Sequence, residues 1–280
     1  MYASTQTATI SPATRPHRSR AFVARIITPL FPTPVMVYIV GDAPRDRTEG
    51  FPVTTPLLLE FYERLPELHP GDDEELWAAG AQDAMKEFRT AVRERYSEGT
   101  LQRLLNTTDV PTRRAAVLAL GLIGTCDSNA AVAALLRDPD TLIQRFASDS
   151  LWELWFRGGT SEQNWRLQQA ARQTDSVVAR TDLDDLIREA PTFAEAYNQR
   201  AIWFFKRGEY TRAIEDCETV LRLNPFHFGA AAGLGQCLLK LKKHRAALRA
   251  FQQAYDLNPT LEHLCDTIRQ LEEATDSREE

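Results

Sequence analysis

Two stretches near the end of the chain decide its fold. Phe193–Pro225 has the sequence FAEAYNQRAIWFFKRGEYTRAIEDCETVLRLNP, and Phe228–Pro259 has the sequence FGAAAGLGQCLLKLKKHRAALRAFQQAYDLNP. Both end in Leu-Asn-Pro, and their final prolines lie 34 residues apart. In each stretch, small and apolar residues recur at helical spacing on both sides of a polar turn. A helix cannot easily continue into the residue before a proline. Each stretch therefore predicts two helices joined by a turn.

The 34-residue period extends toward the start of the chain. Pro191 precedes Pro225 by the same interval, and alanines keep it at Ala179, Ala213 and Ala247. The pattern resembles the tetratricopeptide repeat, with Gly208-Glu209-Tyr210 at a turn and Leu223-Asn224-Pro225 at a repeat end. Ser161–Pro191 resembles a degenerate first repeat that lacks the turn glycine. Leu261–Glu273 would then be the closing helix that covers the last repeat.

A second period, of 31 residues, lies upstream. It relates Leu104-Leu105 to Leu135-Leu136, Asp109 to Asp140, Arg114 to Arg145, Ala116 to Ala147 and Leu120 to Leu151. These units resemble HEAT-type repeats of phycobilisome-lyase-like proteins. That resemblance implies an Asp–Arg ladder between neighbouring repeats. Residues 57–65 and 75–96 also have helical spacing, without a repeat assignment.

These patterns predict an all-α solenoid in which HEAT-like repeats are followed by tetratricopeptide repeats. Residues 1–50 would be a flexible N-terminal segment, 51–158 the HEAT-like region and 159–280 the tetratricopeptide region. Because a repeat cannot bury its apolar face alone, the two regions should pack together. We expect core tryptophans at their junction: Trp152, Trp155 and Trp165.

The first 35 residues are basic and contain no acid. They have three interpretations: a targeting peptide, an extension upstream of a true start at Met36, or an ordinary tail. The apolar run 21–40 contains three prolines, which disfavours a membrane-spanning helix. A cytoplasmic protein is the default prediction, with targeting as the alternative.

Composition and motifs argue against catalysis. The net charge of −6 disfavours a general nucleic-acid binder, and no common nucleotide, zinc or hydrolase motif is present. The five histidines lack metal-ligand spacing, so we predict no metal and no cofactor. The four distant cysteines should be reduced and buried. Cys126 has no nearby base to activate it, so a structural role is expected.

Two charged runs have competing interpretations. Asp72-Asp73-Glu74-Glu75 could bind a cation, but acidic residues also favour the first turn of a helix. A basic cluster could dock an acidic peptide or simply be a solvated turn: Lys240, Lys242, Lys243, His244, Arg245 and Arg249.

The tetratricopeptide resemblance implies a concave groove lined by the first helix of each unit. It predicts partner-binding residues Asn198, Gln199, Ile202, Phe205, Lys206, Gln236 and Lys240. The run Gly229–Gly233 has almost no side chains, which indicates either room for a partner or close helix packing. Tyr197-Asn198-Gln199-Arg200 resembles the carboxylate clamp of chaperone-binding repeats. However, Gly229 and Gly233 stand where that clamp has basic residues. The standard clamp is therefore rejected.

We thus predict a non-catalytic adaptor that binds a peptide or helix of another protein. Two alternatives stay open. One is a chromophore-lyase-like enzyme or assembly factor acting through the HEAT-like repeats, and the other is a co-chaperone with a non-standard clamp.

Overall fold

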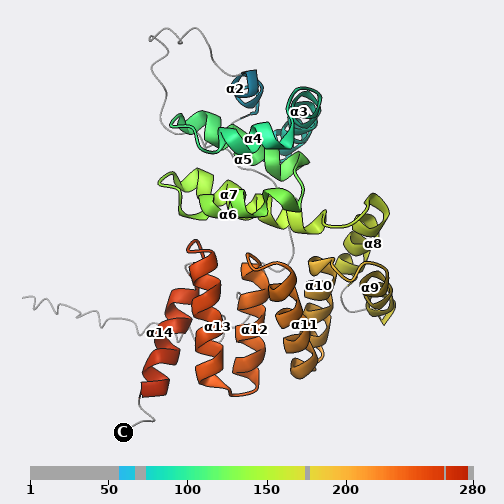
Figure 1. Cartoon of the computed structure of the whole chain (residues 1–280), viewed down its shortest axis with the longest axis vertical. Coiled ribbons are helices and arrows are strands. Elements are labelled where there is room, and N and C mark those ends of the chain that lie inside the picture. Colours follow the sequence, from blue (N-terminus) through green and yellow to red (C-terminus); the bar gives the residue numbers. More distant parts are fainter. Residues whose placement is uncertain (1–56, 67–73, 174–176, 262, 277–280) are drawn as a thin grey trace, which may run out of the picture. The chain divides into compact units, whose positions relative to one another are not determined.

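The computed structural model describes residues 57–66, 74–173, 177–261 and 263–276. These residues lie within one compact unit, Pro32–Glu280, and contain helices and turns but no strand. The prediction of an all-α helical-repeat solenoid is confirmed (Figure 1). The predicted flexible segment 1–50 lies outside the described residues, as do Asp72 and Asp73 of the acidic run. Glu74 and Glu75 open a helix, as the helix interpretation of that run expects.

The first part of the described chain consists of short and medium helices. Its elements are α2 (Leu57–Tyr62), α3 (Glu74–Arg95), α4 (Glu98–Leu104), α5 (Val110–Ile123), η2 (Cys126–Ser128), α6 (Asn129–Ala134), η3 (Leu135–Arg137) and α7 (Thr141–Phe156). The helices expected over residues 57–65 and 75–96 are confirmed by α2 and α3. The two aspartates of the 31-residue period begin helices: Asp109 accepts from Thr112 N and Asp140 from Ile143 N, both at 2.9 Å. The period therefore marks helix starts, because a carboxylate satisfies amides that the first turn leaves unpaired.

The second part consists of helix pairs. Its elements are α8 (Ser161–Arg172), α9 (Val177–Glu189), α10 (Ala194–Lys206), α11 (Tyr210–Leu223), α12 (Phe228–Lys240), α13 (His244–Leu257) and α14 (His263–Asp276). The two quoted stretches fold as α10–α11 and α12–α13, and Figure 1 shows these four helices side by side. Small residues bring the helices together: Ala213 and Ala247 are fully buried.

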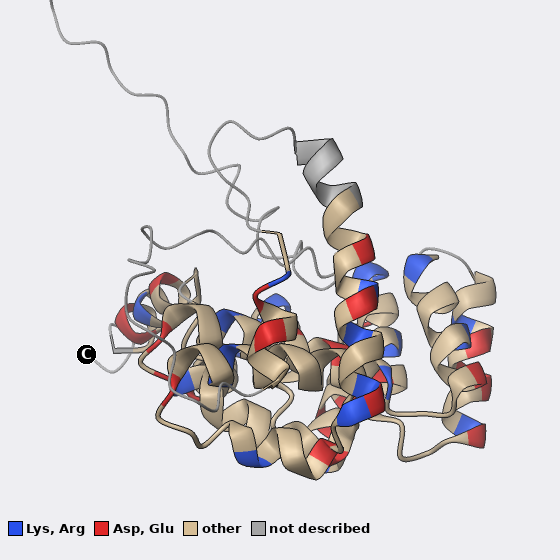
Figure 2. Cartoon of the chain, turned by 90° about the horizontal axis from the view of Figure 1, so that it is seen from above, with Lys and Arg blue, Asp and Glu red and all other residues tan. Residues whose placement is uncertain are grey.

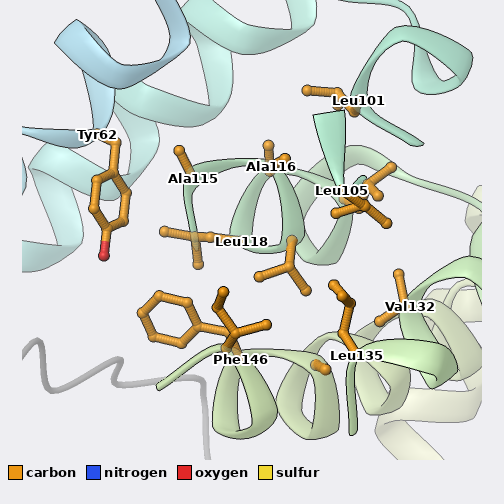
Figure 3. Packing of buried hydrophobic residues seen from close by; sticks show 14 of the residues in the cluster. Tyr62, Leu101, Leu105, Ala115, Ala116, Leu118, Val132, Leu135 and Phe146 are labelled. Carbon is orange, nitrogen blue, oxygen red and sulfur yellow. The ribbon is translucent and has the colours of Figure 1, made fainter. Parts of the chain in front are cut away.

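One hydrophobic cluster holds the first part together and extends into the second. Figure 3 shows part of it, where Leu101 of α4, Leu105 at the end of that helix, Leu118 of α5 and Phe146 of α7 lie close together. Residues from the helix pairs join the same cluster: Phe228 is buried in it, and Leu257 and Leu261 pack against it. Burying one such side chain contributes about 1.5–3 kcal/mol. The two parts therefore share a core.

The Leu-Asn-Pro ends of the repeats add hydrogen bonds to this shared core. Asn129 Nδ2 donates to Asn224 Oδ1 at 2.7 Å, and Asn258 Nδ2 donates to Ser148 Oγ at 3.2 Å. Each repeat asparagine also accepts from the amide two residues later, at 3.2 Å for Asn224 and 3.1 Å for Asn258. Equivalent residues of successive repeats thus hold the first part of the chain.

Candidate partner-binding surface

The seven residues predicted to bind a partner lie on α10 and α12 but differ in accessibility. Asn198, Gln199 and Ile202 are buried. The others are half-buried or exposed: Phe205, Lys206, Gln236 and Lys240. Whether any of the seven contacts a partner stays a prediction. Only the second set is accessible in this structure.

A buried carboxylate explains why the first turns of α10 are closed. Glu195 Oε1 accepts from Asn198 Nδ2 at 2.9 Å and from Gln199 Nε2 at 2.6 Å. Its second oxygen, Oε2, lies 2.8 Å from Nε2 of the fully buried His227. His227 Nδ1 accepts from Ala230 N at 3.0 Å, so the neutral ring carries its proton on Nε2 and donates to Glu195. Three donors thus compensate a carboxylate that has no access to water.

Trp155 of α7 covers this network. Its ring stacks on His227, with centroids 4.0 Å apart and planes 20° from parallel. Its Nε1 donates to Asn129 Oδ1 at 2.9 Å, and Asn129 is the residue that donates to Asn224. The hydrogen bonds and the stacked rings therefore connect α6 and α7 to α10 and α12. We call this set the closed end: Glu195, Asn198, Gln199, His227 and Trp155.

Trp152, also on α7, occupies the space beside Gly229. A Cβ at position 229 would lie 2.4 Å from Trp152 Cη2, so only glycine permits the contact. A Cβ at Gly233 would meet only Cys217 Sγ, at 3.5 Å. Of the two interpretations of the glycine run, close packing within the chain accounts for Gly229. Position 233 has room for a Cβ, which would make an ordinary contact with Cys217 of α11.

The junction tryptophans meet the prediction in two cases of three. Trp155 is 2% exposed and Trp152 packs against the shared core. Trp165 is 61% exposed, so the expectation that it is a core residue is wrong. The buried positions of α8 are Leu167, Ala170 and Ala171. Successive helical residues are about 100° apart, so Trp165 lies about 200° from Leu167, on the opposite face.

The side chains that resemble a carboxylate clamp have internal partners. Arg200 binds Asp216 at 2.7 and 2.8 Å and Asp184 at 2.7 Å. Burial acts to lower the pKa of Arg200, but these two carboxylates outweigh it and raise the pKa above its ordinary value. The structure thus uses Asn198, Gln199 and Arg200 to hold α10 in place.

The cysteines fall into two classes. Cys217 and Cys237 are buried as expected, whereas Cys126 and Cys265 are exposed, which corrects the expectation that all four are buried. Cys126 is the first residue of η2, and Cys265 lies in the first turn of α14. Desolvation by neighbouring atoms nevertheless raises the pKa of the Cys126 thiol. A raised pKa keeps the less nucleophilic protonated form at neutral pH.

Charged residues of both signs are interspersed along the helices (Figure 2). One pair forms the predicted ladder contact: Arg114 binds Asp140 of the following 31-residue unit at 3.1 and 2.5 Å. Arg113 adds a second pair, with Asp138, at 3.1 Å through both nitrogens. The HEAT-like resemblance itself stays a prediction.

Within the described ranges there is neither a group of three potential metal ligands nor a helix able to cross a membrane.

Comparison with known proteins identifies the class of repeat in the second part. The tetratricopeptide repeat family model matches residues 167–225 and, overlapping them, 198–262. The chain thus carries tetratricopeptide repeats from α8 to the end of α13, including the predicted degenerate unit for most of its length.

Three relatives resemble parts of the chain. A TPR repeat-containing protein of Rhizobium etli is 31% identical over 126 residues, 44% of this chain and 61% of the relative. Human Superkiller complex protein 3 is 31% identical over 70 residues, 25% of this chain and 4% of the relative. The bovine SGT1 homolog is 30% identical over 102 residues, 36% of this chain and 30% of the relative. The chain spans less than two thirds of the length of each.

Proposed function

We propose that this chain is a non-catalytic adaptor that captures a peptide or helix of a partner protein on its tetratricopeptide repeats. The observation that carries the proposal is the combination of matched repeats with an accessible stretch of α10 and α12. Helical repeats of this kind form extended surfaces suited to binding. The net charge of −6 favours a protein partner over nucleic acid or an anionic membrane. Action in the cytoplasm remains part of the proposal.

The proposed contact surface is the end of α10 and α12 away from Trp152. We call it the open end: Phe205, Lys206, Gln236 and Lys240. Phe205 offers a half-buried ring that packs edge-on against Tyr210, with centroids 5.5 Å apart. Gln236 carries an amide that can donate to or accept from a peptide backbone. Asn198, Gln199 and Ile202 would support this surface from inside.

The test is affinity capture from the native cells by the tagged chain, with capture by an open-end variant beside it. The variant carries Phe205→Ala and Gln236→Ala. A matched control carries Leu223→Ala and Gln253→Ala, which remove the same kinds of atoms from exposed positions of α11 and α13. Thermal melts check that both variants fold.

We expect the parent chain and the control to capture the same partner protein, and the open-end variant to lose it. The purified partner should then bind the parent chain directly in calorimetry. Equal capture by both variants would contradict the proposed surface. Capture of no partner by any of the three proteins would contradict the adaptor function.

A further inference from the structure

A basic hollow lies at the turn between α12 and α13. Its volume is about 550 Å³, within the range of roughly 300–1,000 Å³ found for ligand sites. It is lined by Lys242, Lys243, His244, Arg245, Ala246, Arg249 and Thr275. Thr275 comes from the last turn of α14, so the turn, α13 and α14 contribute to the hollow. No acidic side chain lines it.

The preceding repeat supplies an internal reference for this turn. The amides of Gly208 and Glu209 donate to carbonyls three and five residues earlier, both at 3.0 Å. The amides of Lys242 and Lys243, which lie 34 residues later, donate to the equivalent carbonyls at 3.0 and 2.9 Å. The two turns therefore have the same backbone hydrogen bonds and can be compared residue by residue.

The comparison reveals an unfavourable backbone choice at Lys242. Gly208 has a φ of 76° and Lys242 a φ of 58°, both in the left-handed region. Glycine adopts this region freely, whereas a side chain at Cβ makes it costly. Among the described residues Lys242 is the only non-glycine with a positive φ. A strained residue that persists is a reason to examine the site for a function.

Two positions carry opposite charges in the two repeats. Glu209 and Glu215 of the earlier repeat are replaced by Lys243 and Arg249. Glu209 forms an ion pair with Arg212 at 2.8 Å. In contrast, Lys242, Lys243 and Arg249 form no ion pair within the described chain. Lys242 and Lys243 lie directly before α13, where the helix dipole favours a negative group.

One polar atom of a residue that lines the hollow lacks a partner. His244 Nδ1 is shielded from water and makes no hydrogen bond with any described residue. A buried ring nitrogen of this kind is usually hydrogen-bonded. Strain at Lys242, unpaired cations and an unsatisfied His244 therefore coincide at one hollow.

We infer that this hollow binds a short acidic segment of a partner protein, with side-chain carboxylates held by Lys242, Lys243 and Arg249. The inference rests on the proposed adaptor function and adds a second contact, made by residues other than those of the open end. The hollow is a small basic patch on a chain whose net charge is −6. Such a patch suits a few carboxylates, whereas a nucleic acid would extend onto surfaces of its own sign.

The test exchanges the turn for its counterpart in the preceding repeat. The exchange variant carries Lys242→Gly, Lys243→Glu and Arg249→Glu, the residues found at positions 208, 209 and 215. Because the same turn already accommodates those residues, the variant should fold. A control carries Arg103→Glu and Arg222→Glu, which reverse two exposed charges elsewhere. The full chain is titrated into a fluorescent peptide of alternating Glu and Gly, and into a matched Gln and Gly peptide.

We expect the parent chain and the control to bind the Glu peptide, and the exchange variant to bind it about tenfold more weakly. Binding should weaken as salt is raised, because the contacting charges are exposed to solvent. Equal weakening in the exchange variant and the control, or equal binding of the Gln peptide, would overturn the inference. So would displacement of the Glu peptide by a single-stranded oligonucleotide at lower concentration. If the exchange variant still captures the partner through the open end, the adaptor function stands and the hollow does not contribute.

Discussion

The two ends of the α10–α12 surface differ although they belong to the same repeats. At the closed end, Glu195 and His227 are fully buried beneath Trp155. At the open end, Lys206 and Lys240 are exposed. The repeat pattern places Glu195, Lys206 and Lys240 on the first helices of their units and His227 directly before one. Their accessibility is decided by α7, which packs against one end. A repeat position therefore predicts a face of a helix, and a distant segment decides whether that face is available.

The largest expected effect is loss of the cover over the closed end. Trp155→Ala removes a buried ring, its stacking on His227 and its bond to Asn129. We expect a loss of about 3–5 kcal/mol in the free energy of unfolding, measured by urea denaturation. Trp165→Ala is the matched control, because that ring is 61% exposed and should change stability by no more than about 0.5 kcal/mol. Similar losses for both would mean that Trp155 does not hold the closed end.

The glycines give the second contrast. Gly229→Ala places a methyl group 2.4 Å from Trp152 Cη2, which must shift, and we expect a loss of about 1–3 kcal/mol. Gly233→Ala meets only Cys217 Sγ at 3.5 Å and should stabilise α12 by up to about 1 kcal/mol through better helix propensity. Thermal melts of the two variants measure the difference. If Gly229→Ala stabilised the chain, the close contact between Gly229 and Trp152 would be contradicted.

A third experiment tests the polar network beneath Trp155. Glu195→Gln keeps the shape of the side chain but replaces one acceptor oxygen by a donor, facing Asn198 and Gln199 or His227. We expect a loss of about 1–3 kcal/mol in urea denaturation, because a buried hydrogen-bonding group is left unpaired. Glu218→Gln, on the exposed side of α11, should have almost no effect. If the two substitutions had equal effects, the network would not stabilise the closed end.

The smallest expected effect concerns the ion pair between Arg114 and Asp140, at the start of α7. Burial acts to raise the pKa of Asp140, but hydrogen bonds and the charge of Arg114 outweigh it, so the pKa is lowered. The pair's contribution is therefore complete above the unfolded-state pKa of about 4 and is lost as pH falls through the lower folded-state value.

Asp140→Asn keeps an N-cap side chain but removes the charge, and should cost about 1 kcal/mol at neutral pH. Urea denaturation at several pH values should show the parent chain and the variant converging in acid. A difference that stays constant down to low pH would assign the loss to the cap instead.

The sequence predicts the helix pairs well because their determinants are local. Pro225 and Pro259 end helices, Gly208 allows the turn, and Ala213 and Ala247 allow close packing. Each of these acts within its own repeat, so a fixed spacing reveals it. The degenerate unit was recognisable for the same reason, through Ala179, Leu183 and Leu186, all of which are buried.

The accessibility of the candidate surface could not be predicted in the same way. Asn198, Gln199 and Ile202 occupy groove positions but are buried. Asn198 and Gln199 donate to Glu195, whose other oxygen faces His227, and Trp155, forty residues before Glu195, stacks on that histidine. That contact follows no period. The sequence does contain the polar residues of the closed end: Glu195, Asn198 and Gln199 lie close together in it, and His227 comes shortly before the next predicted helix. Two tryptophans, Trp152 and Trp155, lie upstream. These residue types predict a buried polar network only if the helices that carry them are already known to be in contact.

The paired asparagines have a consequence for how this chain can lengthen or shorten. Asn224 and Asn258 attach α6 and α7 to two consecutive repeat ends. The distance between the two attachment points on α6 and α7 therefore has to match the length of one repeat. A unit duplicated after α13 would leave both attachments intact. A unit inserted between α11 and α12 would move the two asparagines apart, and only one could keep its contact. The two asparagine contacts therefore permit repeats to be added after α13 but disfavour a repeat inserted between α11 and α12.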